Sequence, residues 1–173
     1  MRKRIITIII IFAITVIITA LATLTPMDNN TAIQINNDVN QTRSVLETNN
    51  VLFEFIFGSN FFVTMLLFIP FVGPIIGFIA FYNTGVSIEG QAIALHFPPT
   101  LSFFVTFLTP VGWLEFVSYS IAIAGSAWLS ARIFQRGFKH ELVNTAKFIS
   151  ICAILLLIGA VIESALIYAL SGS

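Results

Sequence analysis

Two glutamates lie inside long apolar stretches of the sequence. Glu115 follows Pro110 in the stretch 110–131, and Glu163 lies in the stretch 148–170. If both stretches are membrane helices, the two acids lie at matched depth, roughly 8–10 Å below the same boundary at ~1.5 Å per residue. An ionisable side chain costs on the order of 3 kcal/mol at the centre of a membrane helix and usually faces the bundle interior. The pair is therefore a candidate intramembrane polar site that could hold a shared proton or a cation.

Each acid also has a purely structural interpretation, and both interpretations stay open. Pro110 suits the start of a helix, and the positive end of the helix dipole favours an acid in the turns that follow, where Glu115 lies. Glu163 has hydrogen-bonding neighbours of its own in Ser164 and Tyr168. The sequence therefore does not decide between a functional pair and two separately satisfied carboxyl groups.

The other residues that carry chemistry form no recognisable reactive group. The sequence holds no Gly-x-Ser-x-Gly turn, no phosphate-binding loop and no His-rich helix face. Its single cysteine, Cys152, lies in an apolar run and is best explained as a packing residue. His96 stands alone beside the pair Pro98-Pro99, as a loop residue would. We expect no catalytic residue, no metal site and no cofactor, and hence no enzyme.

The composition indicates a protein of the lipid bilayer. Of 173 residues, 57% are hydrophobic and 9% are charged, whereas soluble domains carry about 25% charged residues. The mean hydropathy is +0.97. Eight basic and eight acidic side chains cancel, so no basic field points to a nucleic-acid partner. We expect an all-α, polytopic membrane helix bundle whose partners are the bilayer and other membrane proteins, in a homo-oligomer or a larger complex.

The first 58 residues divide into an anchor and an external segment. Residues 1–24 join a basic start, Met-Arg-Lys-Arg, to an apolar run of about 20 residues, enough to cross a ~30 Å hydrocarbon core. The positive charge predicts a cytoplasmic N-terminus. Residues 25–58 are rich in Asn, Thr and Gln and end in an amphipathic approach to the membrane. Asn29 and Asn40 begin glycosylation-type sequons, which are acceptor sites if the cell glycosylates this external segment.

The next apolar stretch, 60–82, is interrupted by prolines and glycines. We expect one membrane span that is kinked where Pro70 and Pro74 each remove a backbone donor. Gly73 and Gly77 are four residues apart, so they share one helix face that another helix can approach closely. That partner would be the returning segment or the helix that starts at Pro110.

The segment 85–109 decides the number of crossings. Asn83 and Gly85 are interpreted as the C-terminal turn of the preceding helix, with Gly85 able to take a left-handed backbone. The stretch 132–147 is rich in basic residues and should be cytoplasmic, so an odd number of crossings separates it from the external segment. We expect 85–109 to cross as a broken or re-entrant element, which gives five crossings and an external C-terminus. Residues 59–173 form the predicted membrane helix bundle. In the alternative topology, the whole chain has four full membrane helices and one re-entrant element.

Two short motifs match a known family of membrane proteins. The first is a Gly-rich span that ends near Asn-Gly, here NFFVTMLLFIPFVGPIIGFIAFYNTG; the second is Pro-His-Gly-x-x-Glu followed by small residues, here PVGWLEFVSYSIAIAGS. The positions that match are Asn83, Gly85, Pro110, Gly112 and Glu115. Thr84 is inserted in the first motif, and Val111 stands where the second usually has His. On these residues the chain resembles the stage II sporulation protein M family.

The likeness extends to the closing apolar run, GAVIESALIYAL, which contains Glu163. The family's namesake acts as a membrane scaffold for peptidoglycan-degrading proteins in spore-forming bacteria, and many relatives lack that context. The resemblance thus implies an all-helical membrane protein that works through partners.

These observations lead to two hypotheses for a multi-pass protein of the cell membrane. The first is a non-enzymatic scaffold or small subunit of a membrane complex, because reactive groups are absent and small residues suit helix packing. The alternative is a small transporter or channel-like protein that uses Glu115 and Glu163, because broken helices with polar centres commonly line transport sites. An intramembrane hydrolase is disfavoured, because the sequence offers no nucleophile with a base.

Overall fold

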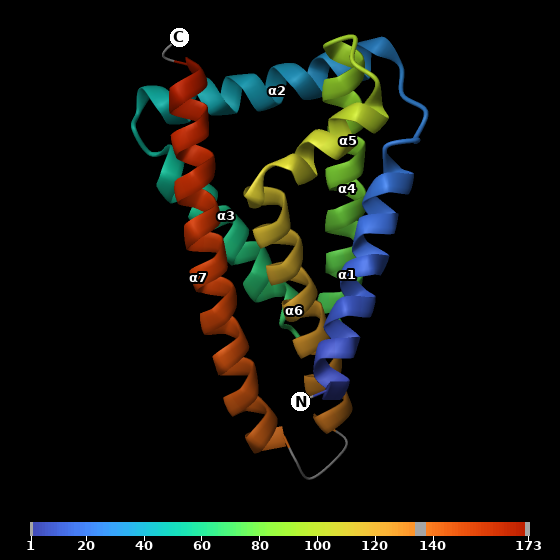
Figure 1. Cartoon of the computed structure of the whole chain (residues 1–173), viewed down its shortest axis with the longest axis vertical. Helices are drawn as coiled ribbons and strands as arrows, with labels where there is room; N and C mark the ends of the chain where they lie inside the picture. Colours follow the sequence, from blue (N-terminus) through green and yellow to red (C-terminus); the bar gives the residue numbers. More distant parts are fainter. Residues whose placement is uncertain (1, 134–137, 172–173) are drawn as a thin grey trace.

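The computed structural model describes residues 2–133 and 138–171, and all regular structure in these ranges is α-helical. The predicted all-α class is confirmed. Figure 1 shows an elongated bundle with one helix, α2, lying across its upper end. We call this end the α2 end, and the opposite end, where α1 begins and α6 finishes, the N-terminal end. The helices are α1 (Arg2–Ala22), α2 (Asn29–Thr48), α3 (Leu52–Leu67), α4 (Gly73–Ala94), α5 (Pro99–Leu108), α6 (Pro110–Ile133) and α7 (Phe138–Ser171).

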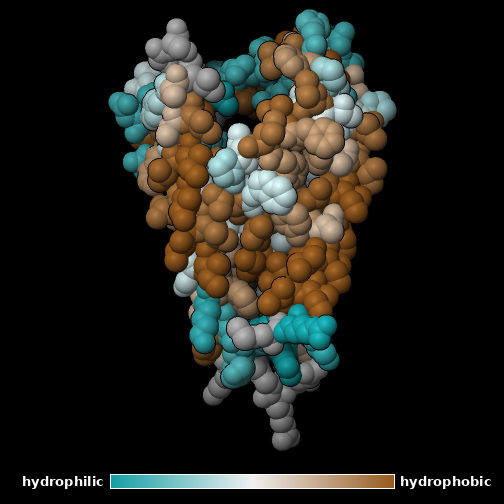
Figure 2. Space-filling model, in the orientation of Figure 1, coloured by the Kyte–Doolittle hydropathy of each residue, from teal (hydrophilic) through white to brown (hydrophobic). Residues whose placement is uncertain are grey.

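The described helices are those of a membrane protein. Two are long and apolar enough to cross a bilayer, Arg2–Ala22 and His140–Ala169, and the bent pair α4–α5 adds a third if it counts as one span. Large apolar side chains such as Ile9 and Leu21 are more than half exposed along α1. Figure 2 shows the same pattern as a hydrophobic band between two hydrophilic ends. Such a band suits lipid rather than water, while the predicted four to five crossings stay a prediction.

The predicted single span over 60–82 is wrong. α3 and α4 are separate helices, and Figure 1 shows that the chain reverses direction between them. In the turn at 68–72, Pro70 interrupts the backbone and Phe71 takes a left-handed conformation with φ of 64°. Pro74 then lies in the first turn of α4, where its missing N–H has no helical acceptor to lose. The prolines therefore stop one helix and start the next instead of bending a continuous one.

Two serines of α6 hold this turn in place. The Ser126 hydroxyl donates to the Ile69 carbonyl at 2.6 Å, and the Phe71 amide donates to the Ser130 hydroxyl at 2.7 Å. These bonds replace helical hydrogen bonds that the turn cannot make, which is the condition for irregular backbone inside a membrane protein. Gly73 lies beside the same site, because a Cβ there would be 2.9 Å from the Ser126 hydroxyl.

The predicted C-terminal turn at Asn83 and Gly85 is also wrong. α4 continues through both residues, and no described glycine has a positive φ. Gly85 instead permits a close approach of α1, because a Cβ at this position would overlap the Thr19 carbonyl oxygen. The left-handed position that ends α4 belongs to His96, with φ of 56°.

The segment 85–109 is broken, as predicted, but it does not form one element. Its first part completes α4, and α5 then leaves at a bend of 118°. Figure 1 shows α5 returning from the α2 end towards the middle of the bundle, where α6 begins at Pro110. The chain thus re-enters the bundle at 99–108 and descends through α6.

Two further predicted boundaries differ from the structure. The external segment 25–58 contains a full helix, α2, and the first residues of α3. The predicted loop at 132–147 is largely helical, because α6 continues to Ile133 and α7 begins at Phe138. Residues 134–137, which include one of the predicted loop's basic side chains, lie outside the described residues.

A buried apolar cluster joins α6 to α1, α3, α4 and α7. Phe81 of α4 contacts Phe116 of α6 with ring centroids 4.6 Å apart, and Phe107 of α5 lies 4.9 Å from the same ring. Gly77 lies against Ile123, so that the small face of α4 meets the helix that starts at Pro110. This packing fixes α6, and with it Glu115, relative to the rest of the bundle.

Candidate functional site

Glu115 is held by neutral hydrogen-bonding side chains. It lies in the second turn of α6, and its Oε1 accepts a hydrogen bond from the Asn60 side-chain amide at 2.6 Å. The Tyr119 hydroxyl, one helical turn further along α6, donates to the side-chain Oδ1 of Asn60 at 2.9 Å. Asn60 comes from the middle of α3, so this network links α3 to α6.

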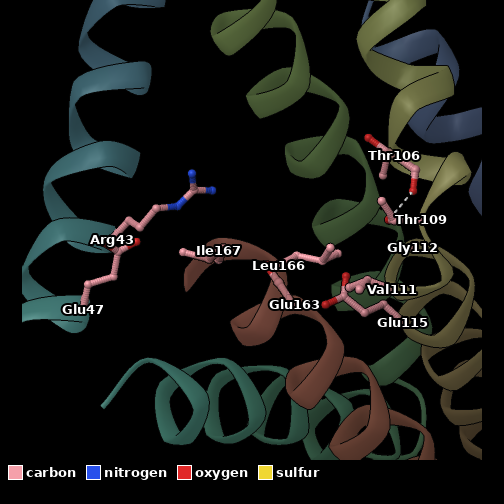
Figure 3. A pocket seen from close by; sticks show the side chains of 10 residues that line it. All are labelled: Arg43, Glu47, Thr106, Thr109, Val111, Gly112, Glu115, Glu163, Leu166 and Ile167. Atoms are coloured by element: carbon pink, nitrogen blue, oxygen red, sulfur yellow. Dashed lines mark hydrogen bonds between the residues drawn. The ribbon is translucent and has the colours of Figure 1, made fainter. Parts of the chain in front are cut away.

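Glu163 of α7 faces the same cavity as Glu115. The cavity measures about 440 Å³. Figure 3 shows the two acids side by side on α7 and α6, with Arg43 extending from α2 into the space opposite them. A second hollow of about 350 Å³ also has Arg43 and Glu163 in its lining, together with other residues of α2. The structure thus brings both candidate acids to one site.

The break between α5 and α6 shapes the cavity wall. Thr109 has extended backbone, with ψ of 145°, and Pro110 begins the next helix. Gly112 then lies so close to α5 that a Cβ would overlap the Thr106 carbonyl oxygen. Thr106, Thr109, Val111 and Gly112 all line the cavity. The predicted motif residues Pro110 and Gly112 therefore position the helix that carries Glu115.

α2 covers the site from the end of the bundle. Ile35 of α2 packs against Gly90 of α4. Arg43 and Glu47 of α2 line the cavity. The helix starts at an N-cap, in which Asp28 accepts hydrogen bonds from the amides of Asn30 and Thr31 at 3.0 Å each. The Thr31 backbone hydrogen bond is the largest cause that lowers the pKa of Asp28 below its ordinary value.

The site can hold a small positively charged species. Two carboxyl groups in one cavity repel each other unless a proton or a cation lies between them. Asn60 and Tyr119 form the hydrogen-bond network that holds Glu115, while Arg43 and Glu163 line the same cavity. Among residues 2–133 and 138–171, no group of three or more His, Cys, Asp or Glu gathers as a metal site.

Three residues of the site were missed by sequence reasoning. Asn60 and Tyr119 carry the hydrogen-bond network, and Arg43 supplies the positive charge at the cavity. Tyr119 had a usable signal, because it follows Glu115 by four residues and must share its helix face. Asn60 is a lone amide among apolar residues, and Arg43 is a lone cation in the segment 25–58.

Other candidate residues lie away from this site. Cys152 is buried, and its thiol donates to the Ser118 carbonyl at 3.3 Å. His96 lines a small hollow of about 110 Å³ beside Asn29. Asn29 and Asn40 are exposed on α2, and their glycosylation stays a prediction.

Comparison with known proteins gives one match. The sequence model of the family described as stage II sporulation protein M matches residues 6–166. No curated protein and no solved structure matches the chain. The match spans all the helices that build the Glu115 site, from α1 to most of α7. The chain therefore belongs to the stage II sporulation protein M family.

Proposed function

We propose that the protein is a small, non-enzymatic transporter or channel-like protein that takes a cation or a proton at Glu115 and Glu163. The observation that carries this proposal is the cavity of about 440 Å³ into which both acids face. A site that only satisfied its own acids would gain nothing from such a space, which is large enough for several water molecules. Intramembrane acids that face the interior of a helix bundle mark ion and proton pathways in other membrane proteins.

The proposed orientation places this cavity on the external side of the cell membrane. The basic start of α1 favours a cytoplasmic N-terminal end. α2 and the last turns of α7 lie at the opposite end in Figure 1. The crossings would then be α1, α3, α4, the broken pair α5–α6, and α7. The proposed path enters beneath α2 and reaches the acids where α5 meets α6.

Flux measurements in liposomes test the proposal. The wild-type protein should show cation or proton uptake that depends on pH, and Glu115→Gln with Glu163→Gln should abolish it. Glu54→Gln is the matched control, because Glu54 is exposed at the start of α3 and does not line the cavity. Uptake that survives in the double variant, or a wild-type protein without uptake, would contradict the proposal.

The family match favours a second candidate function, a scaffold or small subunit of a membrane complex. The match covers residues 6–166, and the resemblance to this family implies a protein that works through partners. Extraction in a mild detergent, followed by mass measurement, should then show a larger assembly that the double Gln variant retains. A monomer at native expression level would count against this role and leave the transport proposal intact.

A further inference from the structure

We infer that the N-terminal end of the bundle carries a second binding site, which takes the phosphate headgroup of an anionic lipid. A cavity of about 530 Å³ lies there between α1, α6 and α7, far along the bundle from the Glu115 site. Its lining includes Arg2, Lys3, Arg4, Trp128, Arg132 and Glu141. Four cationic side chains thus face one carboxylate in a single hollow.

One part of this lining is fixed by its own contacts. Arg4 donates to Glu141 at 2.6 Å, and the Glu141 side chain is only 3% exposed. The Arg4 guanidinium also lies 4.9 Å from the centre of the Trp128 ring. An arginine that is paired and stacked in this way forms a rigid wall, because its rotamer is set before any ligand arrives.

The lining as a whole is rich in positive charge, with four cationic side chains and one carboxylate. Arg4 pairs with Glu141. Arg2, Lys3 and Arg132 are all exposed and come from two different helices. Arginine and lysine bind phosphate oxygens through charge-assisted hydrogen bonds. The arrangement suits a single phosphate group placed between α1 and α6.

The position of the cavity favours a lipid as the source of that phosphate. Figure 2 shows the hydrophilic lower end directly below the hydrophobic band, at the level where headgroups meet acyl chains. Ile5 and Ile6 follow the basic residues on α1 and are 56% and 46% exposed, so they offer an apolar surface to lipid chains. Basic pockets between membrane helices are known to hold acidic headgroups. Charges that only set topology need neither a cavity nor a stacked arginine.

Lipid retention by the purified protein tests this inference. The protein in mild detergent is titrated with phosphatidylglycerol, with phosphatidylcholine or with inorganic phosphate, and bound molecules are counted by native mass spectrometry. The cavity variant is Lys3→Gln with Arg132→Gln. The control is Lys147→Gln, because it removes a cation at an exposed position that lines neither this cavity nor the Glu115 site.

The affinity for phosphatidylglycerol should fall in the cavity variant by roughly fivefold per basic residue, or roughly thirtyfold in all. The control variant should bind like the wild type. Equal loss or equal retention in the two variants would overturn the inference, and so would equal binding of phosphatidylcholine. Binding of inorganic phosphate that competes with the lipid at equal concentration would overturn the lipid assignment in favour of a soluble anion. These outcomes are independent of flux through the Glu115 site.

Discussion

The two ends of the bundle treat their carboxyl groups in opposite ways. At the N-terminal end, Glu141 is almost fully buried and pairs directly with Arg4, so that α7 is joined to α1. At the α2 end, Glu115 is partly buried and is held by the neutral amide of Asn60, while Glu163 shares its cavity. An acid that is paired by its own protein is no longer available to a ligand. The comparison therefore sets an acid that is ion-paired within the chain against two acids that face a cavity.

The largest expected effect comes from breaking the paired end. Arg4→Leu leaves Glu141 buried without its cation, and the loss of one partner from a buried pair costs about 3 kcal/mol. Because Arg4 is 28% exposed, we expect a somewhat smaller loss, about 2–3 kcal/mol, in the free energy of unfolding in detergent. The double variant Arg4→Leu with Glu141→Leu should recover most of this loss. If the double variant were as unstable as Arg4→Leu alone, the unpaired carboxylate of Glu141 would not be the cause of the instability.

A change in the middle of the bundle should affect both ends alike. Gly77→Leu places a side chain against Ile123, and overpacking of this kind costs about 1–3 kcal/mol. Unlike the Arg4 effect, this loss should not change with salt, because no charge is involved. Ile123→Ala combined with Gly77→Leu should restore part of the stability. If the loss of unfolding free energy in Gly77→Leu depended on salt, the distinction between the apolar contact at Gly77 and the ion pair at Arg4 would be wrong.

At the α2 end, the informative change is Asn60→Leu. It removes the donor to Glu115 and the acceptor for Tyr119 together, and unpaired polar groups of this kind cost about 1–2 kcal/mol when partly buried. Thermal unfolding in detergent measures the loss. Tyr119→Phe removes only the outer hydrogen bond and should cost less than Asn60→Leu. If both variants are as stable as wild type, the network does not position Glu115.

The sequence predicted the acids of the α2 end because their placement depends on local spacing. Depth along a helix follows from residue number, so Glu115 and Glu163 could be matched without knowledge of the fold. The class of protein followed from composition in the same way. What the sequence did not reveal is which side chains from other helices meet these acids, and Asn60 is the main example.

The reversal at 68–72 could not be predicted for a related physical reason. Prolines in a membrane segment either kink a helix or end it, and the outcome depends on whether other helices satisfy the freed backbone. Here Ser126 and Ser130 of α6 do so, more than fifty residues away in the chain. Gly85 shows the same limit, because its role is set by the approach of α1 and not by its own turn propensity.

The smallest expected effect concerns the helix that covers the α2 end. Asp28→Ala removes the N-cap of α2, so the amides of its first turn should exchange with deuterium faster at neutral pH. Asp28→Asn is the control, because asparagine caps helices well and carries no titrating group. Protection at the N-terminal end should be unchanged in both variants.

The pH dependence of that exchange sharpens the comparison between the ends. The pKa of Asp28 is lowered in the folded protein, chiefly by the hydrogen bond from the Thr31 amide. The stabilisation that the cap supplies is therefore fully present above the ordinary carboxyl pKa. It is lost as the pH falls through the lowered pKa of the folded protein. The wild type should therefore approach Asp28→Ala in acid, whereas Asp28→Asn should keep its protection. The exchange rate in the first turn of α2 could instead be the same in the wild type and both variants. That result would show that packing against α4, and not the cap, holds α2 in place over Glu115 and Glu163.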